Sequence, residues 1–181
     1  MTKPILKPHH LPQIERLDEK ATNAADHVKL MKIAQLVAKR SACTRAKVGA
    51  LILFTTGEMF VGWNKNPTGQ PCECEKGKTV SDVIHAEIDA INHAYTAGFE
   101  TNGATLYVTR QPCINCARAI VEAGITHVYY RDSDDKSDGL ELLAEHGVLV
   151  DCGWIAGQRD PLIEPSLMQK IQKSWLARWS V

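Results

Sequence analysis

Two short motifs in the sequence carry side chains that bind metal ions and move protons. The first is a His-x-Glu motif formed by His85 and Glu87, and the second is a Pro-Cys-x-x-Cys motif formed by Pro112, Cys113 and Cys116. Cysteines three residues apart in a first helical turn lie on one face, and a helix N-terminus favours their thiolate forms. The spacing therefore predicts a zinc site with His85, Cys113 and Cys116 as ligands.

Three protein ligands leave one position of a tetrahedral zinc ion for water, which is typical of a catalytic site. Because two thiolates offset the charge of the ion, that water is expected to need a neighbouring base. Glu87 can take a proton from the water and deliver it to a substrate nitrogen, which is the chemistry of hydrolytic deamination. His85 and Glu87 are two residues apart, so their side chains converge only at the entrance of a helix.

Simpler interpretations of these residues exist. The two cysteines and a distant histidine could form a structural zinc site that lacks one ligand, and Glu87 could merely interact favourably with a helix dipole. His93, His127 and His146 are interpreted as packed or surface histidines. The conjunction of both motifs at two helix starts favours the catalytic interpretation.

The remaining cysteines are expected to be ordinary thiols. The first twenty residues contain no apolar segment of the kind found in secretory signals, so a reducing cytoplasm is the expected location. In that location, cysteines are more often ligands or free thiols than parts of a disulfide framework. Cys43, Cys72 and Cys74 could instead form an additional metal site, and Cys152 is interpreted as inert.

Composition limits the class of protein that this chain can be. It has 181 residues, which favours one compact domain, and its 21 basic and 21 acidic residues give no net charge. Without a bulk positive field, extended nucleic acid is a disfavoured partner. The longest apolar run is far shorter than the roughly 20 residues that span a bilayer, so no membrane span is expected.

Alternating helices and strands must position the two motifs. Helices are expected over residues 26–40, from Ser81 or Asp82 to Gly98, from Pro112 to Gly124, over 140–144, and over 167–179 with Trp175 and Trp179 on its apolar side. Strands are expected over residues 48–54, 59–63, 105–109, 127–130 and 148–150. The first two strands predict an antiparallel hairpin, and the later ones predict parallel neighbours joined by right-handed crossovers. The sequence therefore predicts an α/β fold with three α/β/α layers and a mixed sheet of about five strands.

With these motifs in place, the sequence resembles the zinc-dependent cytidine and deoxycytidylate deaminase superfamily, and within it the deoxycytidylate (dCMP) deaminases, including those of bacteriophages. The segments that carry the resemblance are residues 40–45 (Arg-Ser-Ala-Cys-Thr-Arg), 48–50 (Val-Gly-Ala), 62–69 (Gly-Trp-Asn-Lys-Asn-Pro-Thr-Gly), the pair Cys72-Glu73, 83–87 (Val-Ile-His-Ala-Glu) and 107–109 (Tyr-Val-Thr). The resemblance runs from about Lys32 to Val150. Together with the prolines and weak periodicity of the first 25 residues, it suggests an N-terminal arm (1–25), a deaminase domain with a cytidine-deaminase-like fold (26–151) and a C-terminal extension (152–181).

The resemblance implies that dCMP is deaminated to dUMP and ammonia, which supplies dUMP for thymidylate synthesis. It also implies a homo-oligomer, often a hexamer, controlled by dCTP with Mg²⁺ and by dTTP. Lys65 stands where such enzymes commonly have glycine, in a loop near the effector pocket, so this control is an open question. Arg110 and Gln111, on the loop beside the base, have no assigned role.

Two residues are candidates for binding the substrate. Asn64 follows a strand and could be a turn residue, but the resemblance implies a hydrogen bond to the deoxyribose. Arg45 could bind the 5′-phosphate through two parallel hydrogen bonds. It could also be an exposed loop arginine, in which case Arg40 or Lys47 could bind the phosphate instead.

Other functions remain alternatives. The same motifs would suit a deaminase of cytidine, deoxycytidine, a modified dCMP or a tRNA adenosine, and least of all a non-catalytic zinc-stabilised module. Trp175 and Trp179 would leave an apolar patch on a monomer unless they pack back on the core, which favours an assembly.

Overall fold

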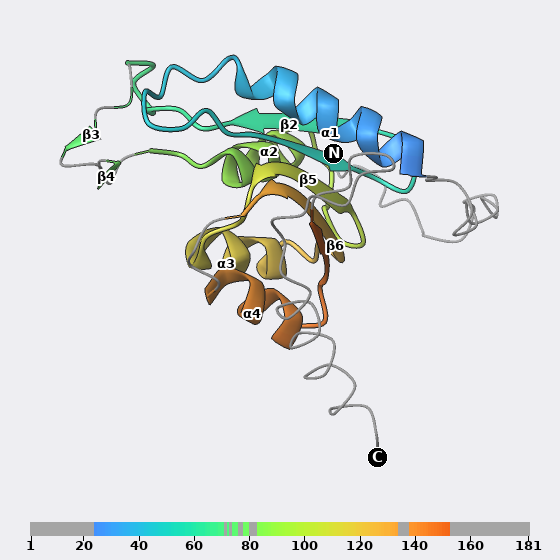
Figure 1. The fold of residues 1–181 in the computed structure, drawn as a ribbon. Coiled ribbons are helices and arrows are strands. Elements are labelled where there is room, and N and C mark those ends of the chain that lie inside the picture. Colours follow the sequence, from blue (N-terminus) through green and yellow to red (C-terminus); the bar gives the residue numbers. More distant parts are fainter. Residues whose placement is uncertain are drawn as a thin grey trace, which may run out of the picture.

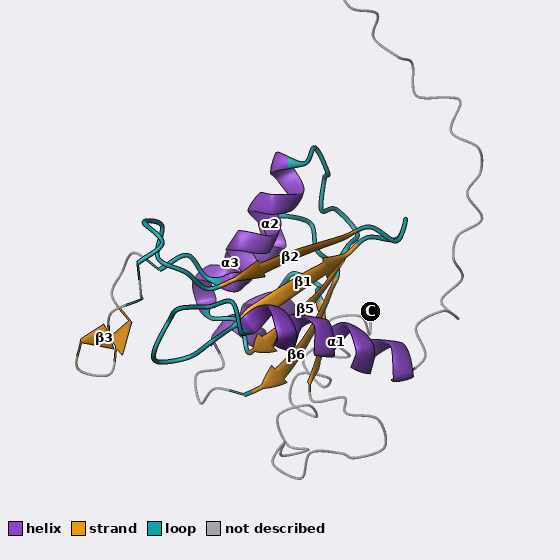
Figure 2. Cartoon of the chain, turned by 90° about the horizontal axis from the view of Figure 1, so that it is seen from above, coloured by secondary structure: helices purple, strands orange, loops and turns teal. Residues whose placement is uncertain are grey.

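A mixed sheet lies at the centre of the computed structural model, which describes residues 24–70, 72, 74–75, 78–79, 83–133 and 138–152. Within these residues five strands are hydrogen-bonded in the order β2-β1-β5-β6-β7 (Figures 1 and 2). The strands are β1 (Gly49–Leu53), β2 (Met59–Trp63), β5 (Thr105–Arg110), β6 (His127–Asp132) and β7 (Leu149–Cys152). β1 is antiparallel to β2 and β5, whereas β5, β6 and β7 run parallel. This topology confirms the predicted hairpin and the predicted mixed sheet.

Helices cover both faces of the sheet, as the sequence predicts (Figure 1). The helices are α1 (Ala24–Ala38), α2 (Ala86–Thr96), α3 (Ile114–Glu122) and α4 (Asp138–Glu145). α1 packs on one face through a small core of Ala34, Leu51 and Tyr107. The other three helices pack on the opposite face, where the larger core lies. Helices on both faces leave the central strand β5 buried over its four middle residues, Leu106 to Thr109.

Two glycines let helices approach the hairpin closely. A Cβ atom on Gly49 would lie 2.2 Å from the Ala34 carbonyl oxygen in α1, and one on Gly62 would lie 2.3 Å from the Ala90 nitrogen in α2. Any larger residue at either position would push a helix off the sheet. Gly62 thus allows α2, the helix that begins beside the first motif, to lie close to the sheet.

Several predicted element boundaries are corrected by the structure. The helix expected to start at Ser81 or Asp82 begins at Ala86, because Ile84 is paired with Lys65 in an isolated β-bridge. Ser81 and Asp82 themselves lie outside the described residues.

The next helix begins at Ile114, with Cys113 rather than Pro112 at its N-terminal boundary, and α1 begins at Ala24. The predicted helix ends near Gly98 and Gly124 are confirmed, since both glycines have a positive φ just after α2 and α3. A two-stranded ribbon, β3 (Cys74–Glu75) with β4 (Lys78–Thr79), was not predicted.

The predictions for the two chain ends largely fall outside the described residues. These are the N-terminal arm up to residue 23 and the C-terminal extension after residue 152, with the helix at 167–179 and its Trp175 and Trp179. None of the helices that the structure describes has the length and apolar character required to cross a bilayer.

Candidate active site

The beginnings of α2 and α3 bring the two sequence motifs together. His85 and Cys113 are the boundary residues that precede these helices, and both have extended backbones, with φ and ψ of −76° and 155° for His85 and −74° and 170° for Cys113. Cys116 lies in the first turn of α3. The expected convergence of His85 and Glu87 at a helix entrance is therefore found, because His85 precedes the helix and Glu87 lies within its first turn.

The three predicted ligand atoms lie at distances that suit one metal ion. The His85 Nδ1 atom is 3.2 Å from Cys116 Sγ and 3.6 Å from Cys113 Sγ, and all three atoms lie within 4.8 Å of one another. Ligand atoms around a tetrahedral zinc ion are about 3.5 Å apart, given bond lengths of about 2.0–2.3 Å. His85 and Cys113 are exposed while Cys116 is buried, so the group opens to solvent on one side.

The protonation of the two thiols is uneven. A hydrogen bond from Cys116, together with one from His85, lowers the pKa of Cys113 to about 3. The same bond to Cys113, followed by burial, raises the pKa of Cys116, and the bond with Cys113 also raises the pKa of His85. One thiolate is thus favoured by the protein alone. A bound cation would favour the second thiolate as well, because cysteine binds metals in that form.

Glu87 lies beside this group with its carboxyl group buried. The residue is 4 % exposed, and burial raises the pKa of its carboxyl group. A hydrogen bond joins its carboxyl group to the Cys116 thiol. A buried carboxyl group with a raised pKa, adjacent to a metal-binding group, is suited to accept and release a proton near neutral pH.

Asn64 lies across the same entrance. Lys65 and Ile84 exchange two backbone hydrogen bonds of 2.9 and 3.0 Å, and continuing that antiparallel register by one residue sets Asn64 opposite His85. The buried Asn64 side chain accepts the Val48 N–H at 2.8 Å through Oδ1 and donates to the Ala46 carbonyl at 2.8 Å through Nδ2. Its amide therefore holds the loop before β1, and one further lone pair and one further N–H remain for a ligand.

Arg45 has a different position from the other candidates. It lies in the connection between α1 and β1, and its side chain is exposed. The group formed by His85, Cys113 and Cys116 does not include it. Gln111, which had no assigned role, is buried, and its backbone N–H donates to the Asp132 carbonyl at 2.8 Å.

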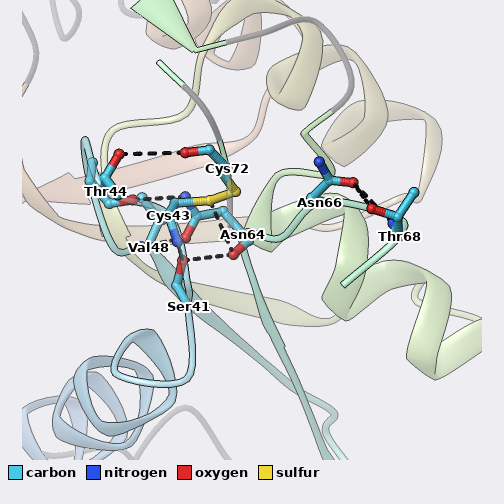
Figure 3. Close-up of a disulfide and its surroundings, with 9 residues drawn as sticks. Ser41, Cys43, Thr44, Val48, Asn64, Asn66, Thr68 and Cys72 are labelled. Carbon is cyan, nitrogen blue, oxygen red and sulfur yellow. Dashed lines mark hydrogen bonds between the residues drawn. A yellow bond between two sulfur atoms is a disulfide. The ribbon is translucent and has the colours of Figure 1, made fainter. Parts of the chain in front are cut away.

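The prediction of ordinary thiols is wrong for Cys43 and Cys72, which form a disulfide (Figure 3). Their Cα atoms are 4.4 Å apart although 29 residues separate them in sequence. The loop before β1 meets the segment after Asn64 here, and the Thr44 hydroxyl adds a 3.4 Å bond to the Cys72 carbonyl. The Cys43–Cys72 disulfide also removes two of the three thiols of the additional metal site that the sequence suggested.

Asp89 is a residue of this region that the sequence analysis missed. It lies in α2 two residues after Glu87, is 3 % exposed and pairs with Lys65 at 2.6 Å. The available signal was an acidic residue between Ile88 and Ala90 in a helix expected to pack on the sheet, because a buried acidic residue almost always has a partner.

Comparisons with known proteins agree with this geometry. The profile of the cytidine and deoxycytidylate deaminase zinc-binding region matches residues 24–132. ComE operon protein 2 of Bacillus subtilis (strain 168) is 36 % identical over 127 residues, which cover 67 % of each chain. The deoxycytidylate deaminase of Mycobacterium phage D29 is 34 % identical over 114 residues, which cover 54 % of this chain and 88 % of the phage protein.

A solved structure is similar over most of the described fold. The dCMP deaminase of the cyanophage S-TIM5, crystallised with dCMP and dUMP, superimposes with a TM-score of 0.68 at 34 % identity. The match covers 72 % of this chain and 98 % of the phage protein. Since the family profile spans more than half of the sequence and includes both motifs, the chain belongs to the cytidine and deoxycytidylate deaminase family.

Proposed function

We propose that this protein catalyses the zinc-dependent hydrolytic deamination of dCMP to dUMP and ammonia. The observation that carries the proposal is the buried Glu87 carboxyl group beside His85, Cys113 and Cys116 at the entrances of two neighbouring helices. The choice of dCMP is supported by the phage deoxycytidylate deaminases and by the cyanophage structure that contains dCMP and dUMP. The absence of net charge also favours a small nucleotide over a tRNA substrate.

The proposed metal ligands are His85 Nδ1, Cys113 Sγ and Cys116 Sγ, whose donor set and spacing fit Zn²⁺. Zinc held in this way supplies a Lewis acid that activates water at neutral pH. Glu87 would take a proton from the attacking water and deliver it to ring N3 as the C4–O bond forms, and would then carry the remaining hydroxyl proton to the departing amino nitrogen. The C4–N bond then breaks, ammonia leaves, and the ring is left as uracil.

The proposed substrate contacts divide between Asn64 and Arg45. Asn64 is opposite His85 in the strand register and would present its remaining N–H or lone pair to the deoxyribose. Arg45 would bind the 5′-phosphate with its guanidinium group, which matches phosphate oxygens through paired hydrogen bonds. Replacing Arg45 by alanine should raise KM for dCMP and leave the activity on deoxycytidine nearly unchanged.

Further properties stay predictions. We infer that the deaminase domain spans residues 26–151, an assignment supported by the family match to residues 24–132. A homo-oligomer, control by dCTP with Mg²⁺ or by dTTP, and a cytoplasmic location also stay predictions. Sedimentation of the purified protein and dCMP assays with each nucleotide added would test the first two.

A substrate panel tests the proposed function. Ammonia release is measured for zinc-loaded protein with dCMP, CMP, deoxycytidine, cytidine and a tRNA that contains the target adenosine. The proposal predicts that dCMP gives the highest kcat/KM and that deoxycytidine is much poorer. Equal rates on dCMP and deoxycytidine would contradict the nucleotide assignment. A protein that binds zinc and deaminates none of these compounds would support the non-catalytic alternative.

A further inference from the structure

Lys65 and Asp89 form an ion pair that the chemistry of the site does not require. The Lys65 Nζ atom lies 2.6 Å from Asp89 Oδ1. The Asp89 side chain is buried, whereas the Lys65 side chain is 31 % exposed. A buried carboxylate is costly to keep unless it has partners, and a single unpaired one destabilises a fold strongly. Lys65 is the cation that compensates Asp89.

The second oxygen of Asp89 binds the same strand end. Asp89 Oδ2 accepts the backbone N–H of Trp63 at 3.2 Å, so one carboxylate contacts residues on both sides of Asn64. The Lys65 ammonium group also lies over the Trp63 ring, 4.8 Å from its centroid. His93, one turn further along α2, has its Nε2 atom 3.7 Å from Asp89 Oδ1, and its Nδ1 atom is 2.7 Å from the Val61 carbonyl. The end of β2 is therefore bound to α2 through the side chains of Asp89 and His93.

These contacts connect the two halves of the proposed site. On one side is residue 64, between the two residues that Asp89 holds. On the other side are His85 and Glu87, which share the first turns of α2 with Asp89. The Asp89 N–H donates to the His85 carbonyl at 3.0 Å, and Lys65 is paired through its backbone with Ile84. The ion pair therefore joins the segment that carries Asn64 to the helix whose first turn is bonded to His85.

We propose that the Lys65–Asp89 ion pair is a positioning element that sets the distance between Asn64 and the pair of His85 and Glu87. The pair acts through the backbone of residues 63–65 and touches neither substrate nor metal. This inference rests on the proposed function. It also gives Lys65, which departs from the glycine implied by the resemblance, a role that a residue without a side chain could not perform.

The expected consequence of losing the pair is a misplaced substrate. A displacement of about 1 Å between a substrate-binding group and the reacting atoms can cost about a hundredfold in rate. Loss of the Lys65–Asp89 ion pair should therefore lower kcat more than it changes KM. The Lys65 side chain supplies none of the proposed ligand atoms, so the zinc content should stay unchanged.

A double-mutant cycle tests the proposal. Lys65→Met keeps the aliphatic stem and removes the charge, and Asp89→Asn keeps an acceptor for the Trp63 N–H. For each single variant and for the combined variant, kcat and KM for dCMP are measured together with zinc content and Tm. Each single variant should lower kcat by about tenfold, and the combined variant should be no worse than the poorer single one, because the two residues act as one unit. Lys65→Arg should retain most of the rate.

Controls separate positioning from simple stability. Lys32→Met changes an exposed lysine on α1 and should leave kcat unchanged. If the variants lower only Tm, and kcat per zinc-loaded chain stays constant, the pair is merely structural and the proposal is overturned. Additive effects of the two substitutions would overturn it as well.

The outcome for the unsubstituted protein distinguishes this inference from the proposed function. If dCMP is not deaminated but another compound of the panel is, the substrate assignment fails, and the cycle is measured on that compound. A protein that deaminates nothing contradicts both.

Discussion

Two pairs of cysteines in this chain have opposite arrangements. Cys113 and Cys116 are local partners, three residues apart at the start of α3, and they remain free thiols next to His85. Cys43 and Cys72 are distant in sequence, lie in connecting segments and are joined as a disulfide. The same residue type thus forms a metal-binding group where a helix start holds it and a covalent link where two loops meet. Backbone context, more than residue type, decides the chemistry.

The two regions also differ in what surrounds them. The free thiols lie near a buried carboxyl group whose pKa is raised by burial, which equips the region for proton transfer. The disulfide lies near the Ser41 hydroxyl, which donates to the Asn64 carbonyl at 2.8 Å, so its surroundings hold a loop in place. The first region should therefore control the reaction, and the second should control stability.

Glu87→Gln should have the largest effect on activity. The amide cannot accept and return a proton, so kcat should fall by about 10²- to 10⁴-fold, while zinc content stays the same. Turnover of dCMP and metal analysis on the same sample check this prediction. Near-normal turnover would show that the reaction does not need the Glu87 carboxyl group.

Cys116→Ala should remove the metal as well as the activity. Cys116 is buried and is one of the three proposed ligands, so the variant should lose zinc and unfold at a lower temperature. Cys152→Ala is the matched control, because Cys152 lies outside both the disulfide and the His85, Cys113 and Cys116 group. It should retain zinc and turnover, and equal zinc loss in both variants would refute the ligand assignment.

Cys43→Ser should separate stability from metal binding. Loss of a disulfide with this loop length should lower the free energy of unfolding by about 3 kcal/mol. Zinc content should be unchanged, because Cys43 does not belong to the ligand group. Denaturant unfolding and metal analysis give both values. Loss of zinc in this variant would show that the disulfide contributes to metal binding as well as to stability.

Gly139→Ala should have a smaller effect on stability, but it should also weaken zinc binding. A Cβ atom on Gly139 would lie 2.3 Å from the Pro112 carbonyl oxygen and 3.0 Å from the Cys113 carbonyl carbon, so the substitution pushes α4 against a ligand-bearing segment. The free energy of unfolding should fall by about 1–3 kcal/mol, and zinc should bind more weakly.

Gly57→Ala is the control for that substitution. Gly57 has a φ of 97° and no neighbouring atom within 4 Å of its ideal Cβ position. The alanine there should cost about 1 kcal/mol through backbone conformation alone and leave zinc affinity unchanged. Weaker zinc binding in both variants would mean that the effect of Gly139→Ala does not pass through Cys113.

The sequence predicted those parts of the molecule that depend on local spacing. Helical periodicity and turn residues located the hairpin, the parallel strands and the ends of α2 and α3, and the spacing of Cys113 and Cys116 predicted a shared ligand face. Features that require tertiary contacts were missed. The start of α2 depends on the pairing of Lys65 with Ile84, and the disulfide depends on two loops meeting, which no local pattern records.

The proposed deamination of dCMP requires one zinc ion at the entrances of α2 and α3. The most direct test is to remove metal with a chelator, add zinc back in steps, and measure dUMP and ammonia at each step. We expect no product from the metal-free protein, equal amounts of dUMP and ammonia after zinc addition, and a rate that saturates at about one zinc per chain. Full dUMP formation by the zinc-free protein would contradict this requirement.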